Sequence, residues 1–156
     1  MSVEKPYQIR FIELMPMGRA LIHNLGSYLS NDVIKKRIRR HHILKALEKK
    51  RRKIDGPAQL YRIDEGLGEI GFISPVSHDF CETCNRLRLT AEGHLRTCLL
   101  AEEETDLKVA LRSGCTDEEL RTMIKDAIAR KPLRHGSLQE TVAVKKCLKG
   151  MSAIGG

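Results

Sequence analysis

The chain is organised around the stretch Gly68–Leu100, which reads GEIGFISPVSHDFCETCNRLRLTAEGHLRTCLL. It contains Cys81 and Cys84 as a CxxC pair, and thirteen residues separate Cys84 from Cys98. Thiolates of cysteine suit soft metal ions and iron–sulfur clusters. Three protein ligands also leave one coordination position open, as in catalytic rather than closed structural metal sites. The cysteine spacing therefore predicts a metal centre.

Two arginines follow the CxxC pair directly. Arg86 and Arg88 are one residue apart on an expected strand, so their side chains emerge on the same face. Guanidinium groups bind phosphate through two parallel hydrogen bonds, which favours an anion clamp beside the metal. The alternative is an ordinary hairpin with both arginines exposed and with Leu87 and Leu89 packed inward. Alternation by itself fits that alternative fully.

Strand signals lie on both sides of the cysteines. Gln59–Ile63 and Glu69–Ser74 predict one antiparallel hairpin. Arg86–Thr90 and His94–Leu99 predict a second hairpin, in which Gly93 supplies the turn conformation. Its return strand would bring the third cysteine back beside the first two.

A zinc site is the competing interpretation of this stretch. His78 precedes Cys81 by three residues, so one histidine and three cysteines form a closed Cys3His set. CxxC hairpins are common in zinc ribbons. A structural zinc would hold the small sheet together in a nucleic-acid-binding or protein-binding adaptor.

The N-terminal third predicts a strand and a long helix. Tyr7–Met15 carries apolar residues on both faces, which is typical of strands buried on two sides in parallel sheets. No downstream segment looks like its partner, so we expect unpaired edges that invite association with another chain. Asn31 or Asp32 starts a helix that is expected to run to about Lys53.

The charge is concentrated in that helix. The chain of 156 residues has 28 basic and 20 acidic residues, for a net charge of +8. Lys35–Lys53 alone holds eleven basic residues and one acidic residue. Aromatic residues make up only 4% of the chain, and no base-reading motif accompanies the basic run. We therefore interpret the run as a solvated helix face and predict no specific nucleic-acid binding.

Composition also limits the compartment. No apolar run approaches the length that spans a membrane, and the first residues lack the apolar core of a secretion signal. Five cysteines, an odd number that includes a CxxC pair, favour a reducing compartment over a disulfide framework. The sequence thus predicts a cytoplasmic protein without a membrane partner.

The region after the cysteines predicts two helices. Thr105–Leu111 is a short helix, and Thr116 with Glu119 forms a capping box for a longer one. The following residues are expected to form the buried face of the longer helix: Leu120, Ile124, Ala127 and Ile128.

The cysteine stretch closely resembles the C-terminal part of the GTP 3',8-cyclase family, the radical SAM enzymes of molybdenum cofactor biosynthesis. The core CETCNRLRLTAEG carries the resemblance most specifically. Further pieces agree along nearly the whole chain: RFIELMPMG, DGPAQLYRI, ETDLKVALRSG, TDEEL, Lys131-Pro132 followed by His135, and the closing Gly155-Gly156.

The resemblance implies an α+β fold in two parts. Residues 1–56 would be the last strand and helix units of an incomplete α/β radical SAM barrel. Residues 57–156 would form a small antiparallel sheet with helices that carries an iron–sulfur cluster and binds GTP.

The resemblance also implies roles for individual residues. The three cysteines, Cys81, Cys84 and Cys98, would hold a 4Fe-4S cluster, and the guanine of GTP would bind the iron that lacks a cysteine. The remaining roles are GTP binding by Arg10, Arg86, Leu87 and Arg88, contact with S-adenosylmethionine by Met15, and an active-site tail formed by Gly155 and Gly156.

The implied reaction converts GTP to (8S)-3',8-cyclo-7,8-dihydroguanosine 5'-triphosphate. The full enzymes carry a second cluster on an N-terminal CxxxCxxC motif, which cleaves S-adenosylmethionine to a radical. This sequence contains no such motif, so we expect it to be catalytically incomplete alone. Its expected partners are GTP and either a second copy of itself or a separate radical SAM half. A GTP-binding module without catalysis and the zinc-stabilised adaptor are the alternatives.

Overall fold

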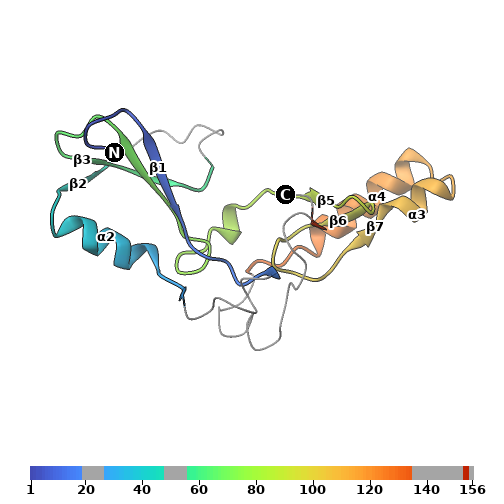
Figure 1. Ribbon diagram of the computed structural model, residues 1–156. Helices are drawn as coiled ribbons and strands as arrows, with labels where there is room; N and C mark the ends of the chain where they lie inside the picture. The colour runs from blue at the N-terminus through green and yellow to red at the C-terminus, as the bar shows by residue number, and fades with distance from the viewer. Residues whose placement is uncertain (19–26, 48–55, 135–152, 155–156) are drawn as a thin grey trace. The chain divides into compact units, whose positions relative to one another are not determined.

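The computed structural model describes residues 1–18, 27–47, 56–134 and 153–154 (Figure 1). The chain divides into two compact units. The first unit comprises Met1–Met15 and Gly26–Phe80, and the second comprises Pro16–Leu25 and Cys81–Gly156. A mixed four-stranded sheet lies in the first unit and a small antiparallel sheet in the second, each accompanied by helix. The α+β class predicted from the sequence is therefore confirmed.

The sheet of the first unit joins distant segments. Its strands are β1 (Gln8–Ile12), β2 (Leu44–Ala46), β3 (Gln59–Ile63) and β4 (Glu69–Ile73), in the order β1-β4-β3-β2. The β3–β4 pair is antiparallel, as predicted, whereas β1 runs parallel to β4 with Phe11 opposite Phe72. The expectation that the first strand lacks a downstream partner is wrong. A parallel partner lies across a long crossover, so nothing near β1 in the sequence indicates it.

Within this chain, β1 is buried on one face rather than two. Ile9 and Phe11 are half-buried, and the ring of Phe11 stacks on that of Phe72 with 5.5 Å between centroids. Ile12, on the opposite face, is 60% exposed. The prediction of burial on both faces is therefore wrong for the described chain.

Helix α2 (Asn31–Arg39) covers one face of the sheet. Ile34 and Ile38 recur four residues apart and pack against a core that also receives Leu44 from β2. The buried centre of this core is Ile63, Ile70 and Phe72. Burying a side chain of this size contributes roughly 1.5–3 kcal/mol. The amphipathic face therefore attaches α2 to the sheet.

The helix is shorter than the sequence predicts. Ser30, rather than Asn31 or Asp32, is the N-cap and accepts a hydrogen bond from the backbone of Val33. Arg40 ends the helix, and the chain continues into β2, which pairs antiparallel with β3. The predicted extension to Lys53 is wrong because strand pairing outweighs the helical tendency of these residues.

The N-terminal segment packs onto the turn between β3 and β4. The backbone nitrogen of Gly68 donates to Ser2 O at 2.8 Å, and that of Leu67 donates to Val3 O at 3.1 Å. A Cβ at Gly68 would lie 2.3 Å from Tyr7 O. Only glycine allows this close approach of two backbone segments.

The second unit contains a three-stranded antiparallel sheet. A 3-10 turn, η2 (Cys81–Thr83), is followed by β5 (Arg88–Leu89), β6 (His94–Arg96) and β7 (Thr105–Asp106), which pair antiparallel in that order. The predicted second hairpin is therefore confirmed, with shorter strands. Gly93 has a positive φ of 89° in its turn, as expected.

Two helices, α3 (Leu107–Arg112) and α4 (Asp117–Ala129), complete the second unit. The predicted capping box at Thr116 and Glu119 is present at the start of α4. The core consists of Leu95, Leu107 and Ala127, with Leu120, Met123 and Ile124 packed against it. Ile128 is 45% exposed, so its predicted burial is wrong and Met123 contributes instead.

The side chain of Ile154 is fully buried, whereas Gly155 and Gly156 lie outside the described residues. The division at residue 56 stays a prediction, although β3 and β4 share a sheet with β1 and β2. No helix in the described ranges is long and apolar enough to cross a bilayer.

Candidate metal centre

The CxxC pair lies on one tight turn of the second unit. The backbone nitrogen of Cys84 donates to Cys81 O at 3.1 Å across η2. Cys98 follows β6 by two residues. None of the three cysteines is in a disulfide, and all three residues are half-buried.

These cysteines fit an iron–sulfur cluster in donor type, since cysteine thiolates are the usual ligands of such clusters. Among the described residues, however, no three side chains of His, Cys, Asp or Glu are gathered around a point where a metal could bind. Ligand atoms that converge only on binding are common, because metal binding is coupled to local folding. The sequence prediction that these three cysteines form one site stays a prediction.

Arg86 and Arg88 lie at the start of the β5–β6 hairpin. Arg86 is exposed and Arg88 is half-buried. Leu87 and Leu89 are 42% and 60% exposed. The ordinary-hairpin alternative required both leucines to pack inward, and they do not. The anion-clamp interpretation of the two arginines therefore depends mainly on their position directly after the CxxC turn.

A buried arginine that the sequence analysis did not single out lies opposite Arg88. Arg96 is its register partner on β6, so both side chains share one face of the sheet. Arg96 is only 2% exposed. Its Nη1 lies 2.8 Å from Glu104 Oε1, and Glu104 also contacts His94 Nδ1 at 2.9 Å. The charge of Arg96 is thus compensated internally, and no sequence motif indicates this pairing.

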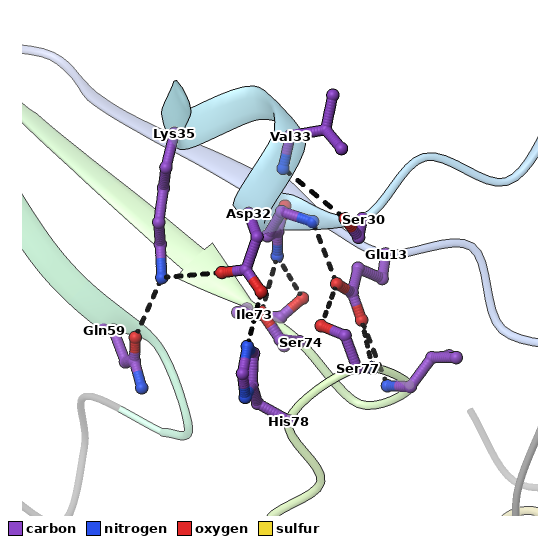
Figure 2. Close-up of polar contacts among 12 residues, drawn as sticks. Glu13, Ser30, Asp32, Val33, Lys35, Gln59, Ile73, Ser74, Ser77 and His78 are labelled. Carbon is purple, nitrogen blue, oxygen red and sulfur yellow. Dashed lines mark hydrogen bonds and ion pairs between the residues drawn. The ribbon is translucent and has the colours of Figure 1, made fainter. Parts of the chain in front are cut away.

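A second polar cluster, centred on Glu13, lies in the first unit just after β1 (Figure 2). Its carboxylate is 2% exposed. Oε1 accepts hydrogen bonds from Asn31 N at 2.9 Å and Ser77 Oγ at 2.5 Å. Oε2 accepts from Ser77 N at 2.9 Å and Val76 N at 3.1 Å. One side chain therefore ties together the end of β1, the start of α2 and the loop after β4.

These contacts set the protonation of the Glu13 cluster. Burial raises the pKa of Glu13, but hydrogen bonds from Ser77, Asn31 and Val76 outweigh burial, so the pKa lies below its ordinary value. Burial, followed by the nearby Glu13 carboxylate, raises the pKa of Tyr28. A charged carboxylate and a neutral phenol are therefore favoured together.

The residues expected to meet GTP and S-adenosylmethionine on the N-terminal side flank Glu13. Arg10 is exposed, and its Nε donates to Gln8 Oε1 at 2.8 Å. Met15 is half-buried. Both belong to the first unit, whereas the cysteines and the other two arginines belong to the second. Arg10 and Met15 are thus described in one unit, and the cysteines with Arg86 and Arg88 in the other. A single site formed by both sets stays a prediction.

His78, the fourth ligand of the alternative zinc site, has a different partner. Its Nε2 lies 2.7 Å from Asp32 Oδ2 at the start of α2 (Figure 2). His78 belongs to the first unit and the three cysteines to the second. The Cys3His alternative gains no support from this contact.

Sequence reasoning gave no role to Lys131 or Arg134, which follow α4. The Nζ of Lys131 donates to Cys84 O at 2.7 Å and to Arg86 O at 3.0 Å, and it lies 3.7 Å from Cys84 Sγ. Arg134 Nη2 donates to Glu82 Oε1 at 2.9 Å. The Lys131-Pro132 dipeptide is one of the pieces that carry the family resemblance. That match was the signal in the sequence that could have pointed to Lys131.

The comparisons with known proteins agree with one another. A family model described as Molybdenum Cofactor Synthesis C matches residues 7–137. A GTP 3',8-cyclase from Thermodesulfovibrio yellowstonii is 44% identical over 155 residues, covering 99% of this chain and 45% of that protein. One from Syntrophomonas wolfei is 43% identical over 130 residues, covering 83% and 39%. One from Heliobacterium modesticaldum is 38% identical over 156 residues, covering 100% and 47%. The chain spans less than half the length of these curated relatives.

Proposed function

Because this chain belongs to the Molybdenum Cofactor Synthesis C family, we propose that it is the GTP-binding, cluster-carrying part of a GTP 3',8-cyclase. The resemblance drawn from the cysteine stretch is confirmed, since its relatives carry that name. The proposed reaction is the conversion of GTP to (8S)-3',8-cyclo-7,8-dihydroguanosine 5'-triphosphate in molybdenum cofactor biosynthesis.

One observation carries the proposal: the CxxC turn and the arginine pair occupy a single short segment of the second unit. Cys81 and Cys84 lie on η2, and Arg86 and Arg88 follow within four residues of Cys84. Thiolates bind iron and guanidinium groups bind phosphate. The same segment can therefore contact both ends of a nucleoside triphosphate.

The proposed roles are those that the family resemblance implies, and the side-chain chemistry of the cysteines and arginines supports them. Cys81, Cys84 and Cys98 would hold the 4Fe-4S cluster, which when bound supplies an iron with a free position for the guanine. Arg86 and Arg88 would bind the triphosphate, and Leu87 would line the nucleotide site. Holding GTP at two ends fixes the ribose for a reaction that a radical SAM part performs.

Partner binding is a further part of the proposal. β1 lies at the end of the strand order in the described sheet, and the neighbouring Ile12 and Leu14 are 60% and 38% exposed. An edge strand with exposed apolar side chains favours pairing with another strand. We assign this edge to a radical SAM barrel half or to a second copy, with Arg10 and Met15 then lining the shared site and Gly155-Gly156 reaching it.

Anaerobic reconstitution tests the proposal. The full chain is incubated with iron, sulfide and reductant, and bound iron and zinc are counted. We expect a brown protein with about four irons per chain. GTP, measured by equilibrium dialysis, should bind more tightly to the loaded protein than to the metal-free protein. A colourless product that retains one tightly bound zinc would contradict the proposal and favour the zinc-stabilised adaptor.

A further inference from the structure

The segment that follows α4 lies across the CxxC turn. Lys131 contacts Cys84 and Arg86, the second of which lies just after the turn. Arg134 contacts Glu82 within the turn. The two Lys131 contacts go to backbone carbonyl oxygens, at 2.7 and 3.0 Å. They therefore restrain the chain itself on both sides of Asn85, whatever the side chains do.

The backbone of Lys131 is held at the C-terminal end of α4. The backbone nitrogen of Lys131 donates to Ile128 O at 3.0 Å in the last turn of α4. Ala127, one turn earlier, is 3% exposed in the core of the second unit. Pro132 follows and restricts the backbone beyond Lys131. The ammonium group is thus held by a packed helix end rather than by a free loop.

The ammonium group also lies beside a proposed ligand atom. Lys131 Nζ is 3.7 Å from Cys84 Sγ, within the range of an N–H···S hydrogen bond. An ammonium group has three donors, so it can serve two carbonyl oxygens and one sulfur together. Hydrogen bonds and charges near cluster sulfurs set the reduction potential of an iron–sulfur cluster.

We infer that Lys131 is a positioning residue for the metal centre. It holds the backbone of Cys84 and Arg86 in place, and it puts a positive charge beside the Cys84 sulfur. The inference rests on the proposed function for its effect on the cluster, but not for its effect on the turn. Groups around metal ligands orient those ligands and tune the metal in this way.

Arg134 contributes less to the same arrangement. Its side chain is 66% exposed, and that of its partner Glu82 is 70% exposed. Exposed ion pairs contribute little because solvent screens them. Lys131, which is half-buried and bonds to backbone oxygens, therefore carries the effect, and Arg134→Met should change the turn much less.

The first measurement uses the full metal-free chain. Amide hydrogen exchange of residues 82–88 is compared in wild type, Lys131→Met, Lys131→Arg and Lys125→Met. Lys125 is an exposed lysine on α4, the helix that precedes Lys131, and it is the matched control for the loss of one positive charge. We expect at least several-fold faster exchange in Lys131→Met, an unchanged rate in Lys125→Met, and partial rescue in Lys131→Arg. Wild-type exchange in Lys131→Met would overturn the inference.

The second measurement is the reduction potential of the reconstituted protein. Removing the positive charge should shift the potential to a more negative value in Lys131→Met, with no shift in Lys125→Met and a smaller shift in Lys131→Arg. An unchanged reduction potential in Lys131→Met would mean that Lys131 has only a structural role, and it would overturn the inference. If wild type assembles no cluster, the proposed function fails, and the exchange experiment alone decides on Lys131.

Discussion

The two units of this chain treat their chemically important side chains in opposite ways. In the first unit, the Glu13 carboxylate is buried and accepts four hydrogen bonds from the same unit. In the second unit, Cys81, Cys84 and Cys98 are only half-buried and none of them is in a disulfide. The first arrangement joins segments of the fold, whereas the second leaves thiols, a metal-ligating group, partly exposed.

The comparison separates stability from binding. Changes around Glu13 or Gly68 should weaken the first unit and leave metal binding by the second unit, as proposed, intact. Changes at the cysteines and arginines should remove binding and leave the stability of the first unit intact.

Cys84→Ser should abolish most cluster binding. Serine lacks the soft thiolate that binds iron. We expect bound iron to fall from about four atoms per chain to below about one after reconstitution. Cys115→Ser is the matched control, because Cys115 is also a free, half-buried thiol but lies outside the proposed ligand set. Equal iron content in wild type and Cys84→Ser would contradict the ligand assignment.

Gly68→Ala should be the most destabilising change in the first unit. The new Cβ would lie 2.3 Å from Tyr7 O and 2.7 Å from Lys5 O, and neither backbone atom can move cheaply. We expect a loss of roughly 3 kcal/mol or more in the free energy of unfolding, measured by urea titration.

Gly114→Ala is the control for backbone strain alone. Gly114 has a positive φ of 80°, but nothing lies within 4 Å of a Cβ built there. We expect this variant to lose about 1 kcal/mol, the typical strain of a left-handed residue. Similar losses in the two variants would show that crowding at the N-terminal segment is unimportant.

Arg86→Ala and Arg88→Ala should weaken GTP binding. Each change removes a charge-assisted hydrogen bond worth roughly 1.5–3 kcal/mol, so affinity should fall by at least about tenfold. Lysine at either position should restore binding only in part, because the planar fork is lost. Unchanged GTP affinity in both alanine variants would leave the two arginines as ordinary hairpin residues.

Glu13→Gln should lower stability at neutral pH by about 1.5–2 kcal/mol, the lower part of the range for hydrogen bonds to charged groups. Because the pKa of Glu13 is lowered on folding, the stabilisation is complete above its ordinary value of 4.5 and is lost as pH falls through the folded-state value. The difference between wild type and variant should therefore shrink in acid. A difference independent of pH would mean that the carboxylate charge is not responsible.

Neutralising the basic end of α2 should have the smallest effect. The exposed residues Arg37 and Arg39 lie in its last turn, where positive charge interacts favourably with the negative end of the helix dipole. Replacing both with Gln should cost about 0.3–1 kcal/mol. It should leave bound iron and GTP affinity unchanged. Tight, sequence-selective RNA or DNA binding that disappears in this variant would overturn our interpretation of the basic run as a solvated face.

Sequence alone determined the features that depend on neighbouring residues. The capping box of Thr116 and Glu119 spans one helical turn, and the turn at Gly93 needs a single residue without a side chain. The β3–β4 pair joins adjacent segments with clear strand patterns. In each case the physical cause acts over a few residues, so the pattern is readable in the chain itself.

Tertiary structure decided what depends on segments that are far apart. The parallel pairing of β1 with β4, the end of α2 at Arg40, and the contact of Lys131 with Cys84 all arise between distant segments. The four hydrogen bonds that Glu13 accepts also come from residues far from it in the sequence. Burial and hydrogen bonding depend on which surfaces meet in three dimensions, and no local periodicity records that meeting.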